Sequence, residues 1–263
     1  MNPLLLLFQL FSPVDPLPLA AFHEQRIAAL KPETPEARAA HRDLGLFWLR
    51  IDRYPDAETH LRLALPDPEV QPFLAEAVAA QGREREAEEL FTGCRTRARC
   101  VARLAQYAER RGDAAAAILL HREALKLDPT NPRRNDLAQA LQAAGQIKEA
   151  EALFRTAARD TAANPENATT WNNLASLLLA TDRPAEAETW QRKALQVFRS
   201  HLGARHVRTG LSASNLADIL RARGREAEAI ALYRQALDIF EEQLPAEHPW
   251  IREAREALRP QSR

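Results

Sequence analysis

Two short stretches contain residue types that perform catalysis in other proteins. His23-Glu24-Gln25-Arg26-Ile27 begins like the H-E-x-x-H motif, in which two histidines one helical turn apart bind zinc. Ile27 stands where the second histidine is needed, so the zinc site lacks a ligand. His41-Arg42-Asp43-Leu44 begins like the catalytic loop of a protein kinase, but Trp48 replaces its asparagine. We therefore expect no catalytic site, no metal site and no cofactor.

The two cysteines are the other candidates for chemistry. Cys94 and Cys100 are the only cysteines. Their spacing is not that of a zinc site, and no pair of histidines accompanies them. Two interpretations remain open. They form a disulfide between neighbouring helical segments if the protein is exported, or they are buried, reduced and packed as small apolar side chains.

The overall charge argues against a nucleic-acid or membrane-surface partner. The chain has 36 basic and 36 acidic residues, for a net charge of zero, which gives no bulk attraction to a polyanion. An arginine-rich segment, 95–111, follows the largely acidic segment 84–89, and this balance favours a solvated face. Only four basic residues are lysine, and together with the alanine content this arginine bias indicates a GC-rich bacterial genome.

The N-terminal segment carries an apolar run, Leu4 to Phe11, which is too short to span a membrane. It fits the hydrophobic region of a signal peptide, with Leu19-Ala20-Ala21 as a cleavage site, although no Lys or Arg precedes it. We expect a periplasmic or secreted protein if this signal is real. The alternatives are a cytoplasmic protein with an apolar tail over its first helix pair, or a misplaced start codon.

The elements that would position any site are pairs of short amphipathic helices. Leu211 to Leu237 has apolar residues three and four apart on both sides of Gly224, which predicts a helix, a turn and a second helix. Neither helix is long enough to be stable alone in water. Stability therefore requires neighbouring copies that bury the apolar faces.

Copies of this pattern run along most of the chain. Units begin at Arg38, Pro68, Ala98, Asn131, Ala168 and Gly210. Counting each of these residues as position 1, small residues recur at positions 8, 20 and 27, large ones at 4, 7, 11 and 24, and a turn residue at 15. Small residues allow close helix approach, and glycine at position 15 allows the left-handed backbone that ends a helix.

This skeleton resembles the tetratricopeptide repeat (TPR) family over about residues 38–245. The resemblance implies an all-α fold, a right-handed superhelical solenoid of about six helix-turn-helix repeats. Residues 1–21 would be the possible signal peptide or apolar tail. Residues 22–37 would form an N-terminal capping helix and linker, and residues 246–263 a C-terminal capping helix and tail.

The two C-terminal repeats resemble the 42-residue TPR variant of kinesin light chains and bacterial quorum-peptide regulators. Residues 196–208 align with residues 239–250, so His206 and His248 both match the histidine of the loop that follows the extended second helix in this variant. We interpret both histidines as loop-capping residues rather than ligands.

The resemblance also implies where a partner binds, because the first helix of each TPR lines a concave groove. In the C-terminal half the groove positions are Asn135, Gln139, Asn172, Asn173, Ser176, Ser214, Asn215, Asp218 and Arg221. In the N-terminal half they include Arg42, Asp43, Glu76, Arg103 and Gln106. Asparagine can both donate to and accept from a peptide backbone. The lysines that hold a terminal carboxylate in some TPR proteins are absent.

We therefore predict a non-catalytic scaffold that binds an extended peptide or a partner helix in its groove. The alternatives are an accessory module of an exported or envelope assembly complex, and an enzyme with an unrecognised active site. A wetted concave face without a ligand would explain the same polar residues. We expect a protein partner, no nucleic acid and no stable membrane span, and the oligomeric state stays open.

Overall fold

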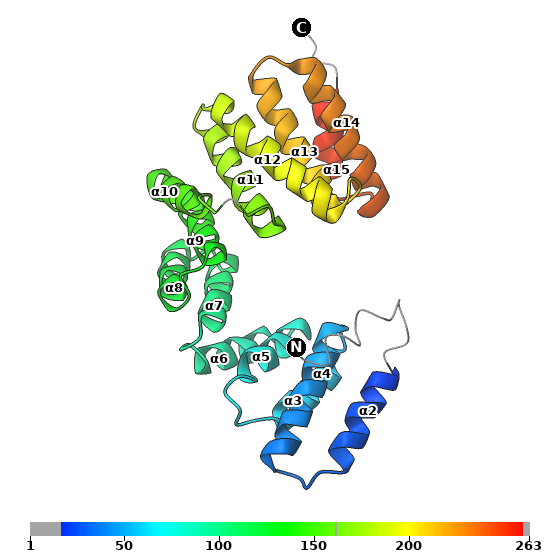
Figure 1. The fold of residues 1–263 in the computed structure, drawn as a ribbon. Coiled ribbons are helices and arrows are strands. Elements are labelled where there is room, and N and C mark those ends of the chain that lie inside the picture. Colours follow the sequence, from blue (N-terminus) through cyan, green and yellow to red (C-terminus); the bar gives the residue numbers. More distant parts are fainter. Residues whose placement is uncertain (1–16, 161, 260–263) are drawn as a thin grey trace. The chain divides into compact units, whose positions relative to one another are not determined.

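The computed structural model describes residues 17–160 and 162–259, and every regular element within these ranges is a helix (Figure 1). The first helices in the chain are α2 (Leu17–Ala28), α3 (Pro35–Arg50), α4 (Tyr54–Leu63), α5 (Gln71–Ala80), α6 (Glu84–Gly93), α7 (Ala98–Arg110) and α8 (Ala114–Leu127). They are followed by α9 (Asn131–Ala143), α10 (Ile147–Ala157), α11 (Pro165–Ala180), α12 (Pro184–Leu202), α13 (Val207–Ala222), α14 (Glu226–Gln243) and α15 (Pro249–Ala257). The apolar run Leu4–Phe11 lies outside the described residues.

The chain divides into two compact units between Tyr107 and Ala108, within α7. In the first unit α3 packs against α4 and α5 against α6. In the second unit α9 packs against α10, α11 against α12, and α13 against α14. Sequential packing of helix pairs confirms the predicted all-α fold of helix-turn-helix repeats.

The turn within each repeat is left-handed at position 15, as the sequence pattern predicts. The backbone φ angles are 79° at Gly82, 76° at Gly112, 76° at Gly145 and 73° at Gly224. Asp52 and Asp182 hold the same position with φ of 61° and 57°. Aspartate is one of the few side chains that enters this region at modest cost, so two repeats make the turn without glycine.

The core of each repeat lies between its two helices. The alanines at positions 8, 20 and 27 are almost completely buried, as Ala138, Ala150 and Ala157 illustrate with 0% exposure. Position 24 is buried in all six repeats, by Leu61, Phe91, His121, Phe154, Gln191 and Tyr233. Four of these residues are apolar or aromatic, but His121 and Gln191 place polar groups in the core.

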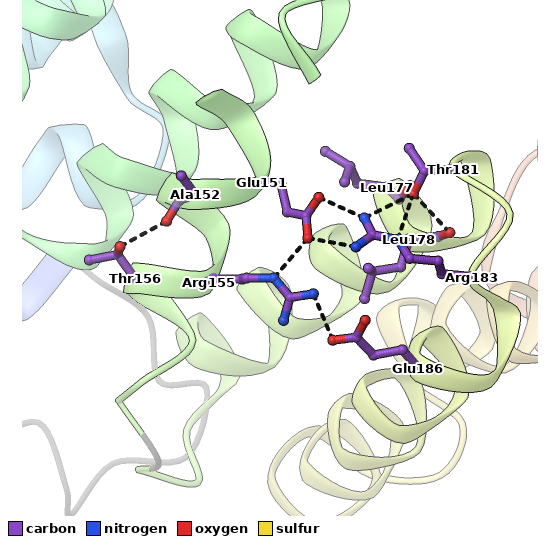
Figure 2. Close-up of polar contacts among 9 residues, drawn as sticks. All are labelled: Glu151, Ala152, Arg155, Thr156, Leu177, Leu178, Thr181, Arg183 and Glu186. Atoms are coloured by element: carbon purple, nitrogen blue, oxygen red, sulfur yellow. Dashed lines mark hydrogen bonds and ion pairs between the residues drawn. The ribbon is translucent and has the colours of Figure 1, made fainter. Parts of the chain in front are cut away.

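The second helices of neighbouring repeats are joined by a recurring ion-pair arrangement, which we call the Glu–Arg triad (Figure 2). In the example drawn, Glu151 on α10 lies 2.8 Å from Arg155 on the same helix and 2.6 Å from Arg183 in the turn of the next repeat. Arg155 continues to Glu186 of that next repeat at 2.7 Å. Each triad therefore holds two consecutive repeats in register.

The same triad recurs at equivalent positions in both units. Its other copies are Glu58 with Arg62 and Arg83, and Glu188 with Arg192 and Arg225. Hydrogen bonds lower the pKa of Glu58 to about 2, and the largest contribution comes from Arg83. Hydrogen bonds likewise lower the pKa of Glu151 to about 2, with the largest contribution from Arg183. Burial alone would raise the pKa of Glu188, but its arginine partners hold it below its ordinary value.

The terminal helices differ in detail from the sequence expectation. The N-terminal helix was expected from Phe22 but begins at Leu17, and Ala20 is buried. Cleavage after Ala21 would therefore remove the first five residues of α2. At the other end, α15 occupies Pro249–Ala257, inside the segment 246–263 expected to hold a capping helix and tail.

Candidate functional site

The polar residues predicted to line a groove converge on three neighbouring first helices of the second unit. Asn173 Nδ2 on α11 donates to Asn135 Oδ1 on α9 over 3.0 Å. Asn215 Nδ2 on α13 donates to Asn172 Oδ1 on α11 over 3.0 Å. We call these four asparagines the amide face. They link α9, α11 and α13 side chain to side chain across successive repeats.

Burial makes the amide face more than a set of solvated polar groups. Asn135 is only 8% exposed, and Asn172, Asn173 and Asn215 are half-buried. Half-buried amides keep a fixed geometry because each is held by a neighbour, while the remaining donor and acceptor atoms stay available to a ligand. A face of this kind can bind a peptide backbone without selecting its side chains.

Gln191 on α12, at position 24 of its repeat, supports this face from the core and was not among the predicted site residues. Its side chain is fully buried, and its Nε2 donates to Asn172 Oδ1 over 2.8 Å. The same nitrogen lies 2.9 Å from both the backbone oxygen and the hydroxyl of Ser212. The sequence signal that could have found it was an amide at a core position that holds an apolar or aromatic residue in four of the six repeats.

Three other predicted residues lie on the same helices without joining the amide network. Ser176 Oγ donates to the backbone oxygen of Asn172 over 3.1 Å, a hydrogen bond within α11. Ser214 is half-buried and Gln139 is exposed. Neither residue makes a side-chain contact with the amide face that the structure describes, so their role in a groove stays a prediction.

Arg221 attaches the last helix, whereas Asp218 is hydrogen-bonded within its own repeat. Arg221 Nη2 donates to the backbone oxygen of Ala257 over 2.7 Å, and its guanidinium lies 4.6 Å from the ring centroid of Tyr233. The hydroxyl of Tyr233 donates to Asp218. Burial raises the pKa of Asp218, which the hydrogen bond from Tyr233 partly offsets. The Arg221 hydrogen bond therefore attaches α15 to α13, and the Tyr233 contacts join α13 to α14.

The predicted groove residues of the first unit are engaged in local ion pairs and hydrogen bonds. Arg42 lies 3.1 Å from Asp67, with Asp43 at 3.4 Å. Glu76 accepts from Arg99 over 2.7 Å, and the Arg103 guanidinium donates to Gln106 over 2.8 Å. This charged surface differs in chemistry from the neutral amide face of the second unit.

The two stretches that resembled catalytic motifs contain histidines that pack against other side chains. His23 is 3% exposed, and burial lowers its pKa. Its ring lies 6.4 Å from that of Phe47. His41 stacks on His60, with the two Nδ1 atoms 3.0 Å apart, a pairing that we did not predict. Within residues 17–160 and 162–259, no three or more His, Cys, Asp or Glu side chains are grouped to hold a metal ion.

The two cysteines are joined by a disulfide in the structure. Their Cα atoms lie 5.9 Å apart, and the bond spans the short connection from the end of α6 to the start of α7. Both side chains are buried, Cys94 at 4% and Cys100 at 0% exposure. The bond therefore closes the junction between the second and third repeats.

His206 and His248 are N-caps, which confirms their interpretation as capping residues. His206 Nδ1 accepts from the backbone nitrogen of Arg208 over 3.1 Å at the start of α13. His248 Nδ1 accepts from the backbone nitrogen of Trp250 over 3.3 Å at the start of α15. Among the helices that the structure describes, none is long and apolar enough to cross a membrane.

Comparison with protein families decides what these repeats are. Three tetratricopeptide repeat models match the chain, at residues 20–72, 108–166 and 166–242. The chain belongs to the tetratricopeptide repeat family. Its C-terminal TPR units have the predicted long second helices, with 19 residues in α12 and 18 in α14, against 11 in α10.

Solved TPR structures share this fold at low sequence identity. BtubC (BKLC) from P. vanneervenii matches with a TM-score of 0.56 and 19% identity, covering 90% of this chain and 81% of that one. A chain of the APC/C hetero-tetramer Cut9–Hcn1 matches with a TM-score of 0.66 and 17% identity, covering 95% of this chain but only 50% of that one.

The C-terminal part of a TPR repeat-containing protein from Cytophaga hutchinsonii matches with a TM-score of 0.59 and 13% identity, covering 92% of this chain and 94% of that one. No curated protein matches the chain. At these identities the likeness shows the TPR fold alone, and function must be argued from the chain's own residues.

Proposed function

We propose that this TPR protein is a non-catalytic scaffold that binds an extended segment of a partner protein along the amide face. TPR proteins generally act as protein-interaction scaffolds, and the chemistry of this face fits that role. The observation that carries the proposal is the pair of inter-repeat amide contacts, Asn173 to Asn135 and Asn215 to Asn172. They line up donors and acceptors on three consecutive first helices.

Charge supports a partner recognised through its backbone rather than through ionic groups. Arg221, the basic residue among the predicted C-terminal groove positions, is already held by Glu226 and by the carbonyl of Ala257. Binding at a neutral face releases few counterions, so its affinity should depend weakly on salt. A nucleic-acid partner would show the opposite, a steep loss of affinity with salt.

The experiment compares partners captured from the native host by wild-type protein and by the Asn172→Ala/Asn215→Ala variant. We expect the double variant to lose at least one partner that wild type retains, because two backbone-binding amides are removed. Asn131→Ala is the matched control, since Asn131 lies on α9 but bonds to Asp160 instead of to the face. Equal capture by wild type and double variant would exclude the amide face while leaving the scaffold role intact.

A second candidate role is an accessory module of an exported or envelope assembly complex. The disulfide between Cys94 and Cys100 favours it, because such bonds persist in oxidising compartments. N-terminal sequencing and fractionation of the protein from its native host test this role. An intact Met1 in the cytosolic fraction would contradict it.

A further inference from the structure

The orientation of the amide face is fixed by one backbone carbonyl. An amide side chain can turn by half a rotation and exchange its donor and acceptor ends, so its neighbours decide its orientation. The backbone oxygen of Ser212 can only accept a hydrogen bond. It lies 2.9 Å from the amide nitrogen of Gln191, and this contact requires the Gln191 NH₂ group to point toward it.

This constraint passes from Gln191 to the surface. The Gln191 NH₂ group also donates to Asn172 Oδ1 over 2.8 Å, so Asn172 must turn its oxygen inward. That same oxygen then accepts from Asn215 Nδ2 over 3.0 Å, so Asn215 must turn its nitrogen toward Asn172. The remaining atoms are the Asn172 NH₂ group, which is a donor, and Asn215 Oδ1, which is an acceptor.

The core position of Gln191 indicates that orientation is its role. At the equivalent position the repeats on either side bury Phe154 and Tyr233. Gln191 is fully buried, and its Oε1 has no hydrogen-bond partner among the described residues. A buried acceptor without a partner destabilises a fold, so an apolar residue would suit packing better. Packing therefore does not explain the amide.

We propose that Gln191 is a positioning residue that sets the donor–acceptor order of the amide face. In this order Asn172 donates to a backbone carbonyl and Asn215 accepts from a backbone N–H of one extended peptide, which selects a single peptide direction. The second amide pair has the same order, because Asn173 donates to Asn135 as Asn215 donates to Asn172. The peptide part of this inference rests on the proposed function, whereas the orientation does not.

The orientation is tested with two isosteric substitutions in the full chain, Asn172→Asp and Asn215→Asp. A carboxylate at position 172 still accepts from both Gln191 and Asn215, whereas one at position 215 has no hydrogen to donate and faces the oxygen of Asn172. We expect the melting temperature of Asn215→Asp to be lower than that of Asn172→Asp by about 3 °C or more. Equal melting temperatures, or the reverse order, would overturn the assignment.

The role of Gln191 is tested by repeating this pair in a Gln191→Met background. Met fills a similar volume without an amide, so Asn172 can then turn, and the difference between the two Asp variants should largely vanish. A difference that persists unchanged would show that Gln191 does not position Asn172. Gln191→Met alone should leave the melting temperature equal to wild type or above it, because it removes the unpaired oxygen.

The peptide part is tested with N-acetyl-pentaglycine amide, which presents backbone without side chains. In ¹⁵N-labelled protein it should shift the side-chain NH₂ signals of Asn172, and Gln191→Met should weaken that shift several-fold. If the melting temperatures follow the expected order but the probe shifts no signal of the amide face, the orientation stands and its use by a peptide backbone is overturned.

Discussion

Arg183 donates two hydrogen bonds to Glu151, of 2.6 and 2.9 Å, from the turn of one repeat to the second helix of the repeat before it (Figure 2). The Glu151 side chain is only 20% exposed, so solvent screens this pair less than it screens most surface ion pairs. Because the arrangement recurs at Glu58 and Glu188, the contact between consecutive TPR units has a strong electrostatic component.

Glu151→Gln should therefore destabilise the protein by about 1–2 kcal/mol, a range that allows for the partial exposure of its arginine partners. The pKa of Glu151 is lowered from 4.5 to about 2 in the folded state, so this stabilisation is complete above about pH 4.5. It should be lost as the pH falls toward 2, because the unfolded chain then binds the proton more readily. Urea unfolding from pH 7 to pH 3 measures both effects.

The control for this prediction is Glu89→Gln. Glu89 forms an ion pair with Arg85 at 3.5 Å, but the two side chains are 70% and 96% exposed. This variant should change the stability by less than about 0.5 kcal/mol. Equal losses for Glu89→Gln and Glu151→Gln would contradict the special role of the triad.

Arg221→Ala should loosen α15 without unfolding the repeats. The substitution removes the hydrogen bond from Arg221 to the carbonyl of Ala257 and the packing on Tyr233. Amide hydrogen exchange within Pro249–Ala257 should accelerate about tenfold, which corresponds to roughly 1.4 kcal/mol. Exchange in α11 should not change. Arg234→Ala, at an exposed position on α14, is the control, and an equal effect there would refute the prediction.

Acid should destabilise the first unit through His41 and His60. Burial lowers the pKa of His41. Burial also lowers the pKa of His60, and the charge of His41 lowers it further. The carboxylates of Glu24 and Asp56 act in the opposite direction and raise the pKa of His60. A lowered folded-state pKa means that stability is complete above about pH 6.5 and declines as the pH falls below it.

NMR titration of the two imidazole rings in the full chain measures this directly. Both rings should titrate below about pH 6.5, and His41→Phe should raise the pKa of His60 because it removes a neighbouring positive charge. The prediction fails if both rings titrate at or above the ordinary histidine value.

Reduction of the disulfide should destabilise the protein by about 2 kcal/mol, because the bond between Cys94 and Cys100 closes a short loop. Cys94 occupies the small-residue position 27, where other repeats have alanine. Cys94→Ala should therefore lose the stabilisation from loop closure but little of the packing energy. Intact mass of protein from the native host should rise by two hydrogens on reduction. An unchanged mass would show that both thiols are free in that host.

Local features of the TPR units could be read from the residues themselves. The turn at position 15 needs a left-handed backbone, and a glycine such as Gly145 predicts it from the residue type alone. The close approach of paired helices needs small side chains, which Ala150 and Ala157 provide at helical spacing. The capping roles of His206 and His248 were instead predicted from the resemblance to the loop histidine of the 42-residue TPR variant, and the structure bears them out.

The site could be read only in part. The family pattern placed Asn172 and Asn215 on successive first helices, but it also included Arg221, which the structure assigns to holding α15. Glu58, Glu151 and Glu188 share position 21 of their repeats, a periodic signal for the pairing of Glu151 with Arg183 that the sequence prediction missed. No pattern marked the stacking of His41 on His60. Each of these contacts depends on the exact rotation and separation of two helices.

The sequence by itself determined the repeat, its turns and the face on which each helix is buried, because these depend on contacts within about thirty residues. Only the tertiary structure decided which polar groups meet. Asn172 and Asn215 are 43 residues apart in the chain, and their contact is produced by the stacking of one repeat on the next. The orientation of their amides depends further on Gln191 and on a single backbone carbonyl of Ser212, a relation that exists only in three dimensions.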